Sequence, residues 1–259
     1  MEWKSLKVSP ELVLYVKNIF FFENEEVEKN MLLPFYADGY PGIIYQQADN
    51  GVILKPKNKT LSEFFLYGQT LTPIELSITG PFQLIAFQLY PFAAKTLLGI
   101  NPRQLNDDCF DMRLLANVNV EKTIGVLKNT RHFPTQKRFV SSFLLSLIEK
   151  STIHPDQRVQ LAITLILNSK GKISLKELRE KLHVTERTLE RQFVEQTGIA
   201  PKQFIKIIQF NTSLRQLSEE EYSKLSDIAY ENEYADQSHF IRMFKKFTGK
   251  TPLEFQKSV

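Results

Sequence analysis

An internal repeat in the last third of the 259-residue chain constrains its fold more than any other feature. Residues 186–204 and 237–255 align without a gap at an offset of 51 positions and share six identities. The identical pairs are Arg191 with Arg242, Phe193 with Phe244, Thr197 with Thr248, Gly198 with Gly249, Pro201 with Pro252 and Phe204 with Phe255. Self-similarity of this length indicates two copies of one supersecondary unit.

The first copy has the pattern of a helix, a short turn and a second helix. We predict helices over residues 175–182 and 186–197. Ser174 and Glu177 have the spacing of a capping box, which would start the first helix, and Thr185 is placed to cap the second. This pattern is typical of a helix-turn-helix unit.

The second copy repeats this pattern with one extra residue in its turn, because the offset upstream falls to 50. Its predicted helices cover residues 226–232 and 237–248, with Asp236 as the cap of the longer helix. Gly249 ends that helix, and Pro252 follows three residues later, where a helix could not have continued.

The longer helix of each copy has an apolar stripe and a polar outer face. Leu189 with Phe193, and Phe240 with Phe244, are i and i+4 pairs that must face a core. The other faces carry the candidate DNA contacts, which are Arg187, Thr188, Glu190, Arg191, Gln237, Ser238, His239, Ile241, Arg242, Lys245 and Lys246. Arginine, glutamine and serine can bond base edges in the major groove, so these faces suit duplex DNA.

The two candidate faces differ in charge. From Gln237 to Lys250 there are four basic residues and no acidic one, which suits a helix lying among phosphates. In the first copy three glutamates outnumber the two arginines. We therefore expect the second copy to anchor DNA and the first to contribute less. The competing structural interpretation is a plain helical bundle with solvated basic residues, and the matching turns and glycines argue against it.

An apolar helical stripe between the copies, over about residues 202–217, predicts one joining helix. Two recognition helices fixed on that helix would enter successive major grooves, about 34 Å apart. Such a protein would read an asymmetric site without dimerising.

The chain up to about residue 100 has short apolar runs separated by glycine and proline turns, which predicts an antiparallel sandwich or small barrel. Helical spacing begins after Pro91. We predict an α+β chain with a mainly β domain over 1–110, a helical connector over 111–156 and an all-α domain over 157–259. The helix over residues 159–167 is apolar nearly all round, so we expect it to be buried.

Composition excludes several classes of protein. A chain that is 42% apolar and 24% charged is neither disordered nor collagen-like, and its net charge of +4 permits an anionic partner. The single cysteine, Cys109, fits a reducing compartment and a packed role. We find no membrane-length apolar segment, secretion leader, metal cluster or enzyme motif. We therefore expect a cytoplasmic protein that is not an enzyme and has no cofactor.

The second copy resembles the AraC/XylS transcription-regulator signature in residues 228–229, 235–240, 242–246 and 249–252. The resemblance covers about residues 157–256. It implies a two-lobed helical DNA-binding domain in a bacterial regulator, often an activator, that binds double-stranded DNA and works with RNA polymerase. Base contacts in that family come from the outer faces described above.

Three residues depart from the family pattern. Glu233 stands where glycine is usual in the turn, and a side chain there is costly if the backbone has positive φ. Arg179 replaces a usual small alanine, and Gln209 replaces a frequent arginine in the joining helix. These changes affect fine contacts and not the fold.

The N-terminal half resembles the β-rich sensor-type domain of some of these regulators. This resemblance implies an effector or oligomerisation role, so a small-molecule effector and a homodimer are both open. Nine aromatic residues would line an apolar pocket or fill the core, with the core favoured: Phe35, Tyr36, Tyr40, Tyr45, Phe64, Phe65, Tyr67, Phe82 and Phe87. The alternative function is a protein-interaction regulator whose degenerate helix-turn-helix domain does not bind DNA by itself.

Overall fold

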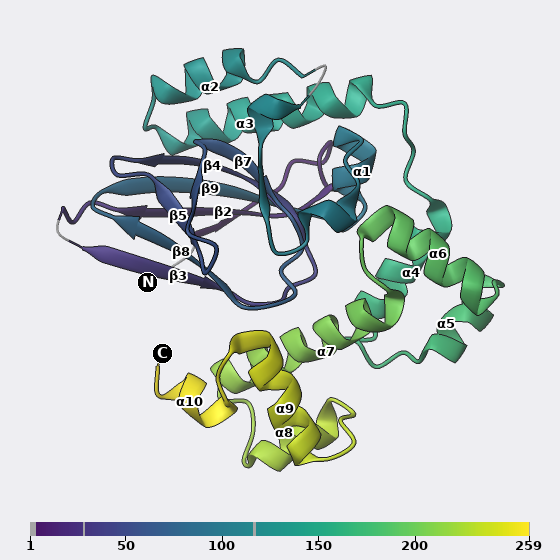
Figure 1. Ribbon diagram of the computed structural model, residues 1–259. Helices are drawn as coiled ribbons and strands as arrows, with labels where there is room; N and C mark the ends of the chain where they lie inside the picture. The colour runs from purple at the N-terminus through teal and green to yellow at the C-terminus, as the bar shows by residue number, and fades with distance from the viewer. Residues whose placement is uncertain (1–3, 28, 116–117, 259) are drawn as a thin grey trace. The chain divides into compact units, whose positions relative to one another are not determined.

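The computed structural model describes residues 4–27, 29–115 and 118–258, and it divides into two compact units (Figure 1). The first unit contains most of the chain up to His154, and the second contains the chain from Pro155 onward together with the short segments Tyr36–Gly39 and Thr70–Pro73. Strands occur only in the first unit among the described residues. The predicted α+β class, with a β-rich N-terminal part and a helical C-terminal part, is confirmed.

The first unit is built on two antiparallel sheets. The larger has the strand order β1-β2-β9-β4-β7-β10, and the smaller has the order β3-β8-β5-β6. The strands are β1 (Lys4–Leu6), β2 (Val16–Asn24), β3 (Asn30–Phe35), β4 (Gly42–Ala48), β5 (Val52–Lys55), β6 (Lys59–Leu61), β7 (Phe64–Tyr67), β8 (Ile74–Thr79), β9 (Phe82–Leu89) and β10 (Cys109–Asp111).

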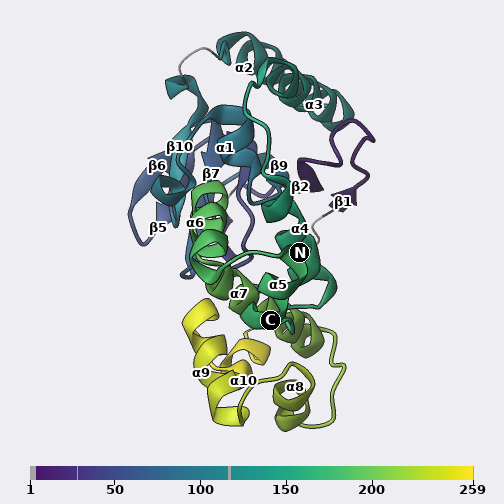
Figure 2. The ribbon, with the colours of Figure 1, turned by 90° about the vertical axis from the view of Figure 1, so that its right-hand side faces the viewer.

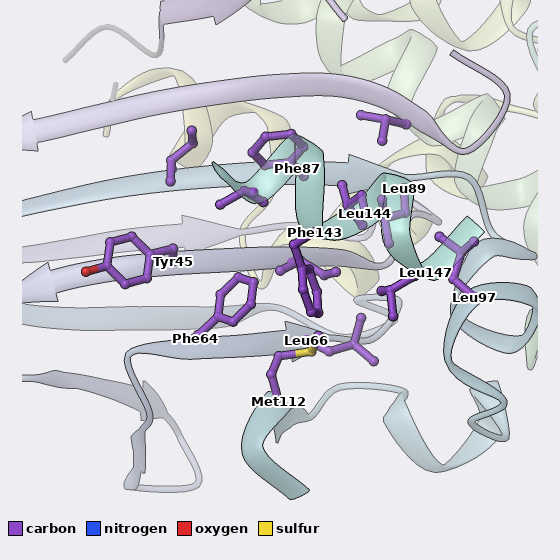
Figure 3. Packing of buried hydrophobic residues seen from close by; sticks show 14 of the residues in the cluster. Tyr45, Phe64, Leu66, Phe87, Leu89, Leu97, Met112, Phe143, Leu144 and Leu147 are labelled. Carbon is purple, nitrogen blue, oxygen red and sulfur yellow. The ribbon is translucent and has the colours of Figure 1, made fainter. Parts of the chain in front are cut away.

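Both faces of the six-stranded sheet are covered. One face packs on the four-stranded sheet, and the other packs on α1 (Ala93–Leu98), α2 (Glu121–Lys128) and α3 (Phe133–Lys150). Neighbouring residues of β7 therefore enter different clusters. Phe64 packs on Phe143 of α3, with ring centroids 5.4 Å apart (Figure 3). Phe65 belongs to the cluster between the two sheets. A central strand buried on both faces loses the alternation of a half-exposed strand.

The segment predicted as a connector contributes to this core. Phe143, Leu144 and Leu147 of α3 point towards the sheet in Figure 3, and they belong to the same cluster as Phe87. Most of the aromatic residues considered for a pocket belong to the two hydrophobic clusters of this unit. Seven of the nine are buried, and Phe35 and Tyr36 are half-buried.

The second unit is entirely helical in its described residues from 155 on. Its helices are α4 (Gln157–Asn168), α5 (Leu175–Leu182), α6 (Glu186–Thr197), α7 (Pro201–Ser218), α8 (Leu225–Glu231), α9 (Gln237–Thr248) and α10 (Pro252–Gln256). The long helix α7 runs between the group α4 to α6 and the group α8 to α10 (Figures 1 and 2), and it contacts both. Across the described residues, no helix combines the length and apolar character needed to cross a membrane.

Candidate nucleic-acid interface

The first copy is α5, the turn at residues 183–185 and α6, and both helices have the predicted bounds. The capping box is present, because the Glu177 amide donates to Ser174 Oγ at 3.2 Å and the Ser174 amide donates to Glu177 Oε2 at 2.8 Å. Thr185 caps α6 by accepting from the Thr188 amide at 3.2 Å. Polar side chains thus satisfy the free amides that start each helix.

The second copy is α8, the turn at residues 232–236 and α9. Helix α9 has the predicted bounds, and α8 begins one residue earlier than predicted. Asp236 caps α9 by accepting from the His239 amide at 2.6 Å. Gly249 ends α9 with φ of 77°, as Gly198 ends α6 with φ of 86°. The repeat in the sequence is therefore a repeat in the backbone.

Buried aromatic rings hold both recognition helices against α7. Phe193 of α6 packs on Phe204, with ring centroids 5.7 Å apart, and Phe244 of α9 packs on Phe210 at 5.6 Å. All four rings are fully buried. Because the apolar stripes are fixed in this way, the opposite faces of α6 and α9 are presented to solvent by a rigid body.

The structure places every candidate DNA contact on one of these two solvent-facing surfaces. Eight are exposed: Arg187, Glu190, Arg191, Gln237, Ser238, Arg242, Lys245 and Lys246. Three are half-buried, namely Thr188, His239 and Ile241. Thr188 and His239 also take part in the caps, since Thr185 Oγ1 donates to Thr188 Oγ1 at 2.9 Å and the Ala235 amide donates to His239 Nδ1 at 3.4 Å. The candidates form two groups, one on each copy.

The two groups differ in their ionic environment. On α6, Arg191 Nη1 lies 3.7 Å from Glu195 Oε2, and the N-terminal Glu186 pairs with Arg179 of α5 at 3.2 Å. On α9, Arg242 has no hydrogen bond or ion pair with any described residue. Lys246 lies over the ring of Phe247, with its nitrogen 5.6 Å from the ring centroid. Arg242, Lys245 and Lys246 of α9 therefore form no ion pair with a described residue, whereas Arg191 of α6 does.

Two of the departures from the family pattern meet at the turn of the second copy. Glu233 has φ of 57°, the left-handed conformation that is costly for a residue with a side chain. Gln209 of α7 donates from Nε2 to the carbonyl oxygen of the preceding residue, Asn232, at 2.6 Å. The side-chain amide of Gln209, which stands where arginine is frequent in the family, thus hydrogen-bonds to the peptide group directly before Glu233.

A buried polar network, which sequence reasoning did not identify, extends this support. Asn232 is 2% exposed and donates to Gln216 Oε1 at 2.8 Å, while Gln216 donates to Glu231 Oε2 at 2.7 Å. Tyr234 shares a 3.3 Å hydrogen bond with Ser213, and burial raises the pKa of Tyr234 to about 12. The turn of the second copy is therefore fixed to α7 by side-chain hydrogen bonds.

Cys109 is a packed residue, as its sequence context predicts. It is 6% exposed, and burial, together with the charge of Asp108, raises its thiol pKa to about 12. A thiol in this environment stays protonated at neutral pH and is a poor nucleophile.

Two helix-turn-helix units joined by one helix define the class of the second unit. A family model described as "Helix-turn-helix domain" matches residues 178–258, and a model described as "Domain of unknown function (DUF6597)" matches residues 4–111. An uncharacterized HTH-type transcriptional regulator of Staphylococcus aureus strain MSSA476 is 24% identical over 131 residues. That match covers 47% of this chain and only 17% of the relative's length.

One solved structure has a similar fold over most of the chain. ToxT from Vibrio cholerae is similar over 93% of this chain and 98% of its own, with a TM-score of 0.50 and 15% identity. The C-terminal domain of AraT, a response regulator from Geobacillus stearothermophilus, is 24% identical over 41% of this chain and 89% of its own, with a TM-score of 0.38. The resemblance found in the sequence is confirmed. The C-terminal part of the chain thus carries a helix-turn-helix domain, and the fold over most of the chain is similar to that of ToxT.

Proposed function

We propose that this protein is a sequence-specific DNA-binding regulator of transcription that places α6 and α9 in successive major grooves. The observation that carries the proposal is the outer face of α9. Arg242, Lys245 and Lys246 are exposed there, Arg242 has no partner among the described residues, and α9 contains no acidic residue. A helix with this face suits the phosphate-lined major groove of DNA.

The residues of α9 divide into two roles by chemistry. Arg242 is central on the outer face, and its planar guanidinium can donate two parallel hydrogen bonds to guanine. Lys245 and Lys246 follow in the last turns and suit phosphate contacts, which position a protein without reading sequence. Gln237, Ser238 and His239 lie at the start of the helix, where HTH recognition helices contact base edges.

Helix α6 would contact the second groove with a weaker set of side chains. Arg187, Thr188 and Arg191 can bond bases or phosphates, and Glu190 can accept from cytosine. The carboxylates of Glu190 and Glu195 repel phosphate, so α6 adds less to non-specific binding than α9.

We also propose that the first unit modulates DNA binding, in keeping with a match to a separate family model over residues 4–111. The sensor-type resemblance leaves two routes open, a small-molecule effector and a homodimer. Light scattering of the full chain with and without a cognate duplex would separate one bound chain from two.

A second candidate function is protein interaction without DNA binding. It is favoured by the charge of residues 220–236, which include six acidic residues and one lysine. Tyr230 of α8 lies within this segment and is 86% exposed. A surface of this kind would suit a basic protein partner.

A selection of random duplex DNA on the full-length protein tests the proposed function. Enriched duplexes are then titrated by fluorescence anisotropy over a salt series. We expect a motif with two half-elements about 10 base pairs apart. Weak, salt-sensitive binding with no enriched sequence would contradict the proposal and favour the protein-interaction function.

A further inference from the structure

The outer faces of α6 and α9 carry the same residue at one position and opposite charges one turn later. Arg191 and Arg242 are equivalent at the repeat offset of 51. Four residues after each arginine, α6 has Glu195 and α9 has Lys246. Residues four apart in a helix lie on the same face, so each of these side chains neighbours its arginine. At this position the two equivalent arginines therefore have neighbours of opposite charge.

The structure pairs the two residues on α6. Arg191 Nη1 and Glu195 Oε2 are 3.7 Å apart, and their side chains are 67% and 54% exposed. The guanidinium of Arg191 thus has an acceptor on its own helix, whereas that of Arg242 has none among the described residues. A guanidinium that turns its Nη1 group to guanine releases this carboxylate, which then lies close to DNA phosphates.

Resting on the proposed function, we infer that Glu195 is a specificity-determining residue that restrains the reading of DNA by α6. It acts in two ways. It competes with guanine for the Arg191 guanidinium, and it adds a negative charge to the face that would meet the duplex. The consequence is that the two helices contribute unequally to recognition: α9 determines the DNA site, and α6 adds a weaker sequence preference.

The expected size of the effect follows from the exposure of the pair. An exposed i and i+4 ion pair stabilises a helix by an amount equivalent to only about a twofold change in an equilibrium. Removing the charge also removes repulsion from phosphate, so Glu195→Gln should raise affinity for the selected duplex about threefold. Glu195→Lys copies the residue found in α9. It should raise affinity about tenfold and steepen the dependence of log K on log salt by about 0.9.

The test compares full-length wild-type, Glu195→Gln and Glu195→Lys proteins by duplex selection and by anisotropy over a salt series. The matched control is Glu219→Gln. Glu219 forms the same kind of i and i+4 pair with Arg215, at 3.0 Å, at the C-terminal end of α7. We expect Glu219→Gln to leave affinity and sequence preference unchanged, and both Glu195 variants to sharpen the half-element read by α6.

Two outcomes would overturn the inference. Unchanged binding by both Glu195 variants would show that the charge does not restrain α6. Weaker binding, with loss of a cytosine preference, would show that Glu195 itself reads a base. Lys246→Glu separates these failures from a failure of the proposed function. It should weaken binding to every duplex if α9 binds DNA, and leave it unchanged if the domain does not.

Discussion

Both copies turn through a non-glycine residue in the left-handed conformation, His183 in the first and Glu233 in the second, with φ of 52° and 57°. These residues are equivalent at the upstream offset of 50. The two turns differ in what supports them. Glu233 follows a peptide group that accepts a hydrogen bond from Gln209, whereas an ion pair of Arg179 with Glu186 joins the two helices of the first copy. The backbone of the repeat is thus set by shared caps and glycines, while each copy has its own support and its own outer charge.

The largest expected effect comes from disturbing the contact between the α4–α5 loop, just before the first copy, and α7. Gly171 has φ of 77°, and a Cβ built there would lie 2.4 Å from the backbone nitrogen of Gln209. Gly171→Ala should destabilise the protein by about 3 kcal/mol or more, through backbone strain and overpacking. Chemical denaturation followed by circular dichroism measures this change.

Gly99→Ala is the matched control for backbone strain alone. Gly99 has φ of 65° at the end of α1, and no atom lies within 4 Å of its built Cβ. We expect a loss of only about 1 kcal/mol. Equal losses at the two glycines would mean that close packing against α7 does not matter.

The next effect compares the two equivalent arginines. Arg242→Ala should cost about 1–3 kcal/mol of binding and relax the preference at one base pair, whereas Lys246→Ala should weaken all sequences about equally. Arg191→Ala should cost less than Arg242→Ala, because Arg191 is already paired with Glu195. Anisotropy titrations with the selected duplex and with single-base variants measure these costs. A uniform loss from Arg242→Ala would remove it as a base reader.

A smaller effect is expected from removing the side-chain hydrogen bond that Gln209 makes to the turn of the second copy. Gln209→Ala removes the donor to the Asn232 carbonyl and should cost about 1–2 kcal/mol of stability. In a double-mutant cycle with Glu233→Gly the two changes should couple, because the held peptide group directly precedes Glu233. Thermal or chemical unfolding of the four proteins gives the coupling energy. Strict additivity would show that Gln209 does not support the strained turn.

The smallest effect is the relief of strain at the turns themselves. Glu233→Gly and His183→Gly should each stabilise the protein by up to about 1 kcal/mol, because glycine adopts positive φ without a Cβ penalty. The gain is reduced by the greater freedom of glycine in the unfolded chain. Unfolding midpoints measured by calorimetry report the change. A loss of stability at either position would show that the side chain makes a compensating contact.

Local signals explain how much of the helical unit could be predicted. The bounds of α5, α6 and α9 follow from Ser174, Thr185, Asp236 and the glycines that end the helices, because caps act within one turn of the residue that makes them. The prediction that the helix over residues 159–167 is buried was wrong, since Leu161 is 47% exposed. Apolar composition alone does not show which side of a helix meets a neighbour.

Long-range pairing explains what could not be predicted. The six-stranded sheet is covered on both faces because α3 returns to pack on β7, far from it in the chain. The polar network of Gln209, Gln216 and Asn232 joins residues 16 or more positions apart. No local pattern marks such pairs, so the outer faces of the recognition helices could be predicted while their support could not.

The unequal roles of the two copies can be tested most directly by a base-by-base scan of the selected duplex. Each base pair is replaced in turn, and affinity for wild-type and Arg242→Ala proteins is measured by anisotropy. The half-element whose discrimination is lost in Arg242→Ala is the one read by α9. We predict that substitutions there cost about 1–3 kcal/mol each and that those in the other half-element cost clearly less. Equal costs in the two half-elements, or larger costs in the half read by α6, would contradict this account.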